Sequence, residues 1–221
     1  MKKFVTIINK FQEKQVDKNG NYKFFIIIEM EAGLCTLNDL IKLRMKTSHF
    51  YSEKETIYIL LNISKALWKA QKNKISHNDV KPHNILFFEN GVYQIFDFDI
   101  SIFESDNEIL ISKPIGSVYY LSPELKSFFE KYQKEEETLD ILYSPFKSDV
   151  YSLGILTLKL MGLSVQEREN LKLKNNEEIS VALNSYQNSY PNLIPLINNM
   201  LSMASYQRKS FKEIKMFCKK L

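Results

Sequence analysis

Apolar residues recur along the chain with two different periods, and each period predicts a different kind of element. Two short runs near the start, residues 4–9 and 23–28, predict two strands joined by a polar turn that contains Gly20. Beyond residue 37, apolar residues recur every three or four positions, as on one face of a helix. Two strands followed mainly by helices predict an α+β fold with a largely helical bulk.

Capping patterns mark where several of these helices begin. A Ser-x-x-Glu pattern at residues 52–55 opens a helix that extends to about residue 71, and the same pattern at 210–213 opens the last helix. The segment 148–161 is apolar on nearly all sides, which predicts a buried helix that ends at Gly162. Shorter helices are predicted over 37–45 and 193–201.

An Asn-Gly pair at residues 90–91 lies between two apolar runs, 85–89 and 92–96. This arrangement is a strong signal for a tight hairpin, because a type I′ turn needs positive φ at both central residues. A two-residue loop would fix the register so that Asn84 faces Asp97. Since directly opposed side chains have Cβ atoms about 5 Å apart, the sequence predicts a carboxamide beside a carboxylate.

Other polar side chains follow the same stretch. Asp79 and Lys81 lie shortly before Asn84, and Asp99 lies two residues after Asp97. Carboxylate and amide oxygens suit Mg²⁺, and Mg²⁺ beside a lysine suits phosphate. For the hairpin alone, the alternative that these side chains merely cap turns stays open.

Composition excludes several classes of protein. The chain has 221 residues and a mass of 26.0 kDa, with 44% apolar and 25% charged residues, which is ordinary for a globular protein. The longest apolar run, Phe24–Ile28, is far shorter than the ~20 residues of a membrane span. Only three of the 30 basic residues are arginines, which argues against a nucleic-acid reader. Two distant cysteines, Cys35 and Cys218, predict reduced thiols and a cytoplasmic protein, with a nuclear location as the alternative.

Five motifs, in the same order as in the family, resemble those of protein kinases, over roughly residues 4–221. The stretch His-Asn-Asp-Val-Lys-Pro-His-Asn at 77–84 resembles the catalytic loop, and Asp-Phe-Asp at 97–99 lies where D-F-G is expected. Ser-Pro-Glu at 122–124 is similar to A-P-E. The segment 149–154 with Asp149 is similar to the part of the buried helix that supports the catalytic loop. Arg208 matches the arginine that pairs with the glutamate of A-P-E, which is Glu124 in this sequence.

The resemblance implies transfer of a phosphoryl group from Mg²⁺-bound ATP to a serine or threonine of a protein substrate. Asp79 would accept the proton of the substrate hydroxyl, and Lys81 would steady the transferred phosphate. Asn84 and Asp97 would hold the Mg²⁺ ions. Lys81 together with Ser117 resembles the Ser/Thr-specific branch of the family.

The resemblance also implies supporting roles and a domain arrangement. His77 and Phe98 are expected to pack in the core rather than react. Ile28 would be the gatekeeper, and Glu29 and Glu31 would offer backbone hydrogen bonds to adenine. Residues 1–28 would be a remnant of the N-lobe, 29–33 the hinge and 34–221 the C-lobe, so that 1–221 forms effectively one kinase domain with a truncated N-lobe sheet.

The chain departs from the family most strongly before the hinge. It contains no G-x-G-x-x-G loop and no lysine in the V-A-I-K context. Either upstream sequence is missing, or the protein lacks that half of an ATP site. The apolar run 24–28 would then be poorly covered, which predicts a protein partner over the incomplete N-lobe.

Three further departures affect the expected activity. Asn78 replaces the arginine of H-R-D, which indicates activity that does not await phosphorylation of the activation segment. Asp99 replaces the glycine of D-F-G, and residues 125–145 resemble an insertion. The alternatives are therefore a pseudokinase that acts as an interaction module and, as a minor one, a small-molecule kinase of the aminoglycoside or choline type.

Overall fold

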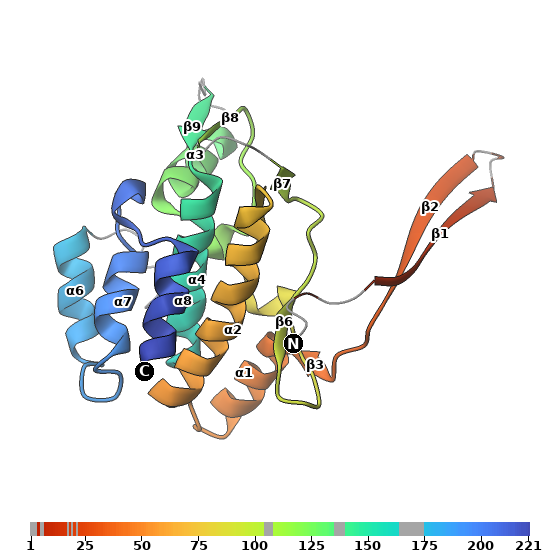
Figure 1. The fold of residues 1–221 in the computed structure, drawn as a ribbon. Coiled ribbons are helices and arrows are strands. Elements are labelled where there is room, and N and C mark those ends of the chain that lie inside the picture. The colour runs from red at the N-terminus through yellow and green to blue at the C-terminus, as the bar shows by residue number, and fades with distance from the viewer. Residues whose placement is uncertain are drawn as a thin grey trace.

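A computed structural model describes residues 4, 7–16, 18, 20, 22–103, 108–134, 140–163 and 175–221 of the chain. It has a helical body from which one long hairpin projects, as Figure 1 shows. The predicted α+β class with a helical bulk is confirmed. The described helices are α1 (Leu37–Lys46), α2 (Glu53–Lys72), α3 (Pro123–Gln133), α4 (Pro145–Leu160), α6 (Asn176–Asn184), α7 (Leu193–Met200) and α8 (Phe211–Lys220).

The predicted capping boxes are confirmed at both sites. The Ser52 hydroxyl accepts from the backbone N–H of Glu55, and the Glu55 carboxylate accepts from the backbone N–H of Ser52, at the start of α2. Ser210 and Glu213 do the same for α8. Sequence analysis missed a third box, at Thr36 before α1, because aspartate rather than glutamate or glutamine occupies its third helical position.

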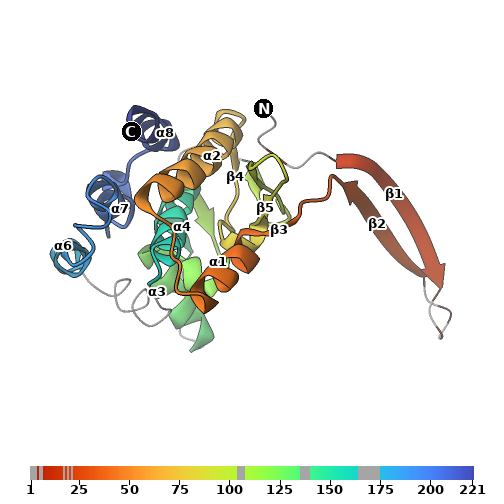
Figure 2. The same ribbon diagram turned by 90° about the horizontal axis from the view of Figure 1, so that it is seen from below.

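Helix α4 forms the centre of the body and is buried along nearly its whole length, as its apolar sequence predicted. It begins three residues earlier than predicted, because Pro145 fits the first helical turn, where its missing N–H is not needed. It ends before Gly162, whose φ is +92° and whose Cβ would lie 2.5 Å from the Phe50 ring. Figure 2 shows α2 and α7 on different sides of α4.

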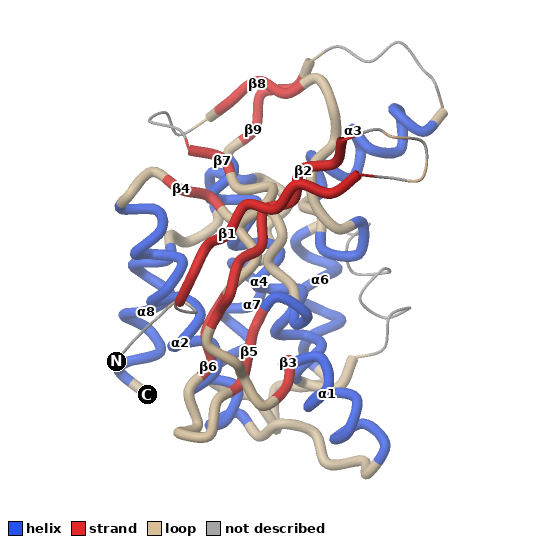
Figure 3. The backbone as a smooth tube through the Cα atoms, turned by 90° about the vertical axis from the view of Figure 1, so that its right-hand side faces the viewer, coloured by secondary structure: helices blue, strands red, loops and turns tan. Residues whose placement is uncertain are grey.

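The strands of the described residues form four small sheets, each antiparallel. Figure 3 shows β8 and β9 together at one end of the molecule and β3, β5 and β6 towards the other end. Among the described residues, no helix combines the length and the apolar character that crossing a membrane requires. The strands are β1 (Ile7–Val16), β2 (Tyr22–Met30), β3 (Cys35–Thr36), β4 (Ile75–Ser76), β5 (Ile85–Phe87), β6 (Tyr93–Ile95), β7 (Ile102–Phe103), β8 (Ile109–Ile111) and β9 (Ile141–Tyr143).

The β1–β2 hairpin is longer than predicted and extends away from the body in both ribbon views (Figures 1 and 2). The first strand begins at Ile7 rather than at residue 4, and Phe4 instead forms an isolated bridge with Ile95 of β6. Strand β2 continues through Met30, so Glu29 and Met30 belong to the strand rather than to the connector at 29–33. Among the described elements, none lies beside the middle of the hairpin in either ribbon view (Figures 1 and 2).

The β5–β6 hairpin is confirmed, but its predicted register is wrong by one residue. Ile85 pairs with Ile95 and Phe87 with Tyr93, which leaves a three-residue loop closed by a hydrogen bond from the Phe88 N–H to the Val92 carbonyl oxygen. Gly91 has a φ of +75°, as expected for a type I turn that ends in a glycine bulge. Asn84 therefore faces Phe96 instead of Asp97.

Candidate active site

The side chains of Asp79, Lys81, Asn84 and Ser117 meet at one point. Lys81 Nζ lies 2.6 Å from Asp79 Oδ2, and Asn84 Nδ2 donates to the same oxygen over 2.9 Å. The Ser117 hydroxyl donates to Asp79 Oδ1 over 2.7 Å and accepts from Lys81 Nζ over 2.9 Å. The Asp79 side chain is 11% exposed, so it lies at the protein surface but is held from three sides.

These contacts keep the Asp79 carboxylate charged. Burial by itself would raise the pKa of Asp79, but the hydrogen bonds from Lys81, Ser117 and Asn84 and the charge of Lys81 outweigh it. The net effect is a pKa below the usual value for aspartate. Asp79 is therefore ionised at neutral pH and can accept hydrogen bonds but not donate them.

His77 supports this aspartate from the core and is fully buried. Its Nε2 lies 3.0 Å from the carbonyl oxygen of Phe96, so Nε2 carries the proton, and Nδ1 accepts from the backbone N–H of Asp79. Burial lowers the pKa of His77, which keeps the ring neutral. The ring also contacts the Phe98 ring at 4.6 Å, so both residues pack as the sequence predicted.

Asp149 of α4 fixes the backbone on which the catalytic loop turns. Its carboxylate accepts from the backbone N–H of His77 over 2.7 Å and from that of Asn78 over 2.8 Å. Burial raises the pKa of Asp149 to about 7, although the two backbone donors act in the opposite direction. Residues more than 70 positions apart in the sequence are thereby joined.

The acidic residues after β6 face a different space from Asp79. Asp97 and Asp99 line a cavity of about 660 Å³ at the base of the hairpin, together with Phe98, Ile28 and Met30. Within the described parts of the chain, neither carboxylate has a hydrogen bond or ion pair. The predicted convergence thus holds for Asp79, Lys81 and Asn84, whereas Asp97 and Asp99 do not contact that cluster.

The three predicted adenine-site residues are not gathered together. Ile28 lines the 660 Å³ cavity and is 45% exposed. Glu29 and Glu31 do not line it, and the Glu29 carboxylate accepts instead from Asn9 Nδ2 on the neighbouring strand. Sequence analysis also missed Phe4, whose ring contacts Phe98 edge to face at 5.7 Å and lines the same cavity.

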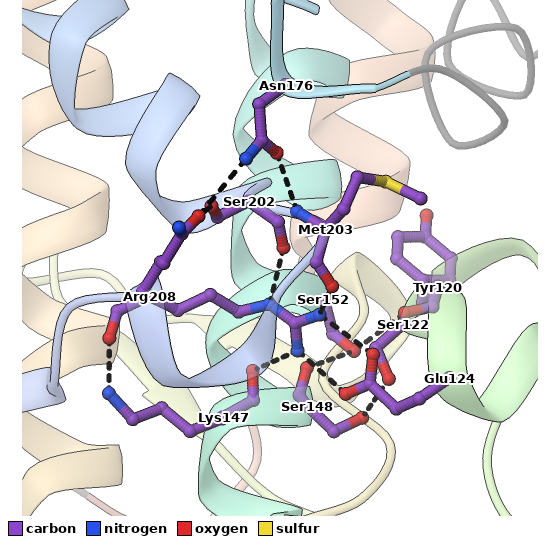
Figure 4. Close-up of polar contacts among 11 residues, drawn as sticks. Tyr120, Ser122, Glu124, Lys147, Ser148, Ser152, Asn176, Ser202, Met203 and Arg208 are labelled. Atoms are coloured by element: carbon purple, nitrogen blue, oxygen red, sulfur yellow. Dashed lines mark hydrogen bonds and ion pairs between the residues drawn. The ribbon is translucent and has the colours of Figure 1, made fainter.

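A second buried network lies behind the segment that carries Ser117 (Figure 4). Arg208 is 1% exposed and forms a bidentate pair with Glu124, with both nitrogen–oxygen distances 2.8 Å. Its remaining N–H groups donate to the carbonyl oxygens of Ser202, Lys147 and Met203, so all five donors of the guanidinium are used. The Arg208 carbonyl in turn accepts from Lys147 Nζ.

This pair confirms the predicted contact of Arg208 with Glu124. Burial by itself would raise the pKa of Glu124, but the guanidinium lowers it below its usual value. Ser152 and Ser148 of α4 complete the anchor through hydrogen bonds to the Tyr120 carbonyl oxygen and the Ser122 hydroxyl. The segment from Ser117 to Glu124 is therefore attached to the central helix.

The amino-acid sequence is similar to those of known protein kinases. The family model of the protein kinase domain matches residues 2–217. A Clostridium acetobutylicum protein described as a probable serine/threonine-protein kinase is 29% identical over 198 residues, which cover 87% of this chain and 26% of its own. Serine/threonine-protein kinase PrkC of Bacillus subtilis is 30% identical over 169 residues (76% of this chain, 22% of its own), and serine/threonine-protein kinase PTK2 of Candida glabrata is 27% identical over 166 residues (72% and 19%).

The chain spans about a quarter of the length of the two bacterial relatives and 19% of the yeast one. The family match nevertheless extends over nearly all of the chain. Its catalytic-loop cluster and its buried Arg208–Glu124 pair are the features by which the sequence resembled this family. The chain belongs to the protein kinase family, and its named relatives are of the serine/threonine type.

Proposed function

We propose that this chain carries the catalytic residues of a kinase that transfers the terminal phosphoryl group of ATP, with Mg²⁺, to serine or threonine hydroxyls of proteins. One observation carries the proposal. The ionised Asp79 carboxylate is fixed at the surface by Lys81, Asn84 and Ser117, although burial alone would favour its neutral form. Such a carboxylate can orient an incoming hydroxyl and receive its proton.

The geometry at Asp79 leaves room for one more donor. A carboxylate offers about four lone-pair positions. Lys81 and Asn84 use those on Oδ2, and Ser117 uses one on Oδ1. The remaining position, on Oδ1, would accept the hydroxyl of a protein substrate, with the Lys81 ammonium close enough to balance charge on the phosphoryl oxygens.

Asp97 and Asn84 are the residues that would hold Mg²⁺. The Asp97 carboxylate and the Asn84 carbonyl oxygen accept no hydrogen bond from the described residues, so both remain available as hard oxygen ligands. Bound Mg²⁺ would neutralise charge on the ATP phosphates.

The domain assignment follows the same proposal. Residues 1–28 would be a remnant of the N-lobe, 29–33 the hinge and 34–221 the C-lobe. Ile28 would lie beside adenine, while Glu29 and Glu31 would contribute only backbone groups. The two cysteines are free thiols, which is consistent with the predicted cytoplasmic or nuclear location.

A second candidate, an interaction module without catalysis, is favoured by the β1–β2 hairpin. Ile7, Ile8 and Phe11 are 49–59% exposed, and an isolated two-stranded hairpin is marginally stable in water. We propose that a protein partner covers these side chains. The 221 residues contain no glycine-rich phosphate loop, and this departure from the family also motivates the second candidate.

Phosphoryl transfer from radiolabelled ATP to a generic protein substrate, with and without Mg²⁺, tests the first proposal. Asp79→Asn should lower kcat by about 10²-fold or more, because it removes the proton acceptor but keeps the shape. Asp140→Asn, which removes an exposed aspartate, is the matched control. Equal rates for wild type and Asp79→Asn would overturn the proposal.

Nucleotide binding, measured beside turnover, distinguishes the two candidates. Mg-ATP should raise the melting temperature of the wild type, and Asp97→Asn should abolish that shift. Binding of nucleotide without any turnover would favour the interaction module. Binding of a protein partner that survives Asp79→Asn and Asp97→Asn but is lost in Phe11→Ser would favour it further.

A further inference from the structure

A short β-ribbon holds the described residues 108–117 that lead to Ser117. Strand β8 of this segment pairs with β9, which comes from the stretch 125–145 that the sequence marked as an insertion. Ile109 and Ile111 pack on one side of the ribbon against a small core that contains Leu121 and Leu125. On the other side, the cross-strand partners Leu110 and Leu142 are about 60% exposed (62% and 61%).

Tyr143 connects this ribbon to the catalytic loop. Its side chain is 2% exposed, and its hydroxyl donates to Asn78 Oδ1 over 3.2 Å. Burial raises the pKa of Tyr143, so the hydroxyl keeps its proton and remains a donor at neutral pH. Tyr143 pairs with Ile109 of β8 in the same ladder, so one residue contacts both segments.

Asn78 has every polar group of its side chain engaged. Its Nδ2 donates to the Ser76 hydroxyl over 3.1 Å and to the Ile100 carbonyl over 3.2 Å, which identifies the remaining oxygen as the acceptor for Tyr143. Within the described parts of the chain, Tyr143 is the donor to that oxygen. Asn78 also has a φ of +61°, a conformation that asparagine adopts more readily than most residues.

The same asparagine contacts the segment that bears Ser117. Gly116 has a φ of +107°, and a Cβ at this position would lie 2.8 Å from the Asn78 carbonyl oxygen. The next residue, Ser117, makes the hydrogen bonds to Asp79 and Lys81. Asn78 is thus one residue from Asp79 and in contact with the backbone just before Ser117.

Neither described arginine holds the segment at Asn78, because both pair with other residues. Arg44 pairs with Glu55 at 2.7 Å, and Arg208 pairs with Glu124 in the buried network. The segment is held by the β8–β9 ladder, by a small apolar core and by the hydrogen bonds of Ser117 to Asp79 and Lys81.

We propose that Tyr143 is a positioning residue of the catalytic site: through Asn78 and the β8–β9 ribbon, it holds residues 109–121 so that Ser117 stays on Asp79. The catalytic part of this inference rests on the proposed phosphoryl transfer. The structural part does not, because it concerns the order of a segment in the free protein.

Hydrogen exchange of the full chain tests the structural part. Tyr143→Phe removes only the hydroxyl, and amides at 109–111 and 116–117 should exchange about 3- to 10-fold faster, the factor expected for one net hydrogen bond. Tyr132→Phe makes the same chemical change at a residue that is 43% exposed and should leave these amides unchanged. Asn78→Ala removes the acceptor of the same hydrogen bond. The double variant with Tyr143→Phe should therefore exchange these amides little faster than the faster of the two single variants.

Kinetics tests the catalytic part. Tyr143→Phe should lower kcat about 3- to 10-fold while the KM for ATP stays constant, because the hydroxyl orients the site without contacting nucleotide. Faster exchange in a protein that shows no phosphoryl transfer would support the positioning role and overturn the proposed function. Unchanged exchange in both Tyr143→Phe and Asn78→Ala, in an active enzyme, would overturn the positioning role and leave the proposed function intact.

Discussion

In the helical body, apolar side chains such as Leu153 and Ile197 are fully buried, whereas Ile7 and Phe11 of the β1–β2 hairpin are 59% and 49% exposed. The body encloses its own core between α2, α4, α7 and α8. The strands of the hairpin are joined by hydrogen bonds, and the described side chains of Ile7, Ile8 and Phe11 on β1 are 49–59% exposed. Stability of the chain should therefore reside in the body, and the hairpin should depend on whatever covers it.

Two ion pairs of the body also differ in how deeply they are buried. Arg208 is buried with five hydrogen bonds, and the pair of Arg44 with Glu55 lies near the surface, where the two side chains are 35% and 44% exposed. Removing one partner of a buried pair leaves an uncompensated charge, whereas water replaces the partner of an exposed pair. Burial, rather than the presence of an ion pair, should decide the effect of each substitution.

The largest effect is expected at Arg208. Arg208→Leu should lower the free energy of unfolding by about 3–5 kcal/mol, because Glu124 and three carbonyl groups lose their donor. Urea unfolding measures the change. Arg44→Leu is the matched control and should cost about 1 kcal/mol or less. Similar losses for both variants would contradict the importance assigned to burial.

The next largest loss of stability is expected from replacing a glycine of the body, and a glycine of the hairpin provides the comparison. Gly162→Ala should destabilise the body by about 2–3 kcal/mol, because it combines positive φ with a Cβ 2.5 Å from the Phe50 ring. Gly20 in the hairpin also has positive φ, at +82°, but nothing lies within 4 Å of its Cβ position. Gly20→Ala should leave the thermal unfolding of the body unchanged, and a comparable loss at both glycines would show that the two regions unfold as one unit.

Glu55 should give a smaller, pH-dependent effect. The Arg44 guanidinium and the Ser52 cap lower the pKa of Glu55 from 4.5 to about 2. Its ionised form therefore stabilises the fold above about pH 4.5, and this contribution disappears as the pH falls through about 2. Glu55→Gln retains the capping group and should cost less than about 1 kcal/mol at pH 7, since the pair is exposed.

The difference between wild type and Glu55→Gln should shrink as the pH approaches 2. Unfolding free energies measured across this range check the sign. A difference that grows at low pH would contradict the assignment of the low pKa to Glu55.

The smallest effect on stability is expected in the hairpin. Phe11→Ser should change the free energy of unfolding of the body by less than about 0.5 kcal/mol, because the ring contributes little to the core. Phe211→Ala in the body should cost about 3–5 kcal/mol, since Phe211 is 1% exposed. A loss of several kcal/mol in Phe11→Ser would mean that the hairpin packs on the body in solution.

Sequence patterns were sufficient for several features that depend on neighbouring residues. The capping boxes at Ser52 and Ser210, the buried helix around Leu153 and the hairpin at residues 90–91 were all predicted. Each follows from local periodicity or from a side chain three positions away. The predicted pairing of Arg208 with Glu124 came instead from resemblance to a family, because no local rule connects residues 84 positions apart.

The register of the β5–β6 hairpin shows where local rules stop. Both a two-residue and a three-residue loop can use a glycine at positive φ, and the structure has the longer one, in which Asn84 faces Phe96 rather than Asp97. Asn84 instead donates to Asp79. A shift of one residue changes which side chains meet, because successive residues of a strand point to opposite faces.

The sequence by itself predicted five of the seven described helices (α1, α2, α4, α7 and α8), the caps at Ser52 and Ser210, and the residues of the loop that resembles the kinase catalytic loop. The tertiary structure alone decided which of those residues touch, that β9 returns to pair with β8, and that Tyr143 reaches Asn78. The physical reason is that propensity and capping act over a few residues, whereas the contacts around Asp79 and Asn78 depend on how distant segments share one core. Arg208, Asp149 and Tyr143 act on the site through packing of this kind.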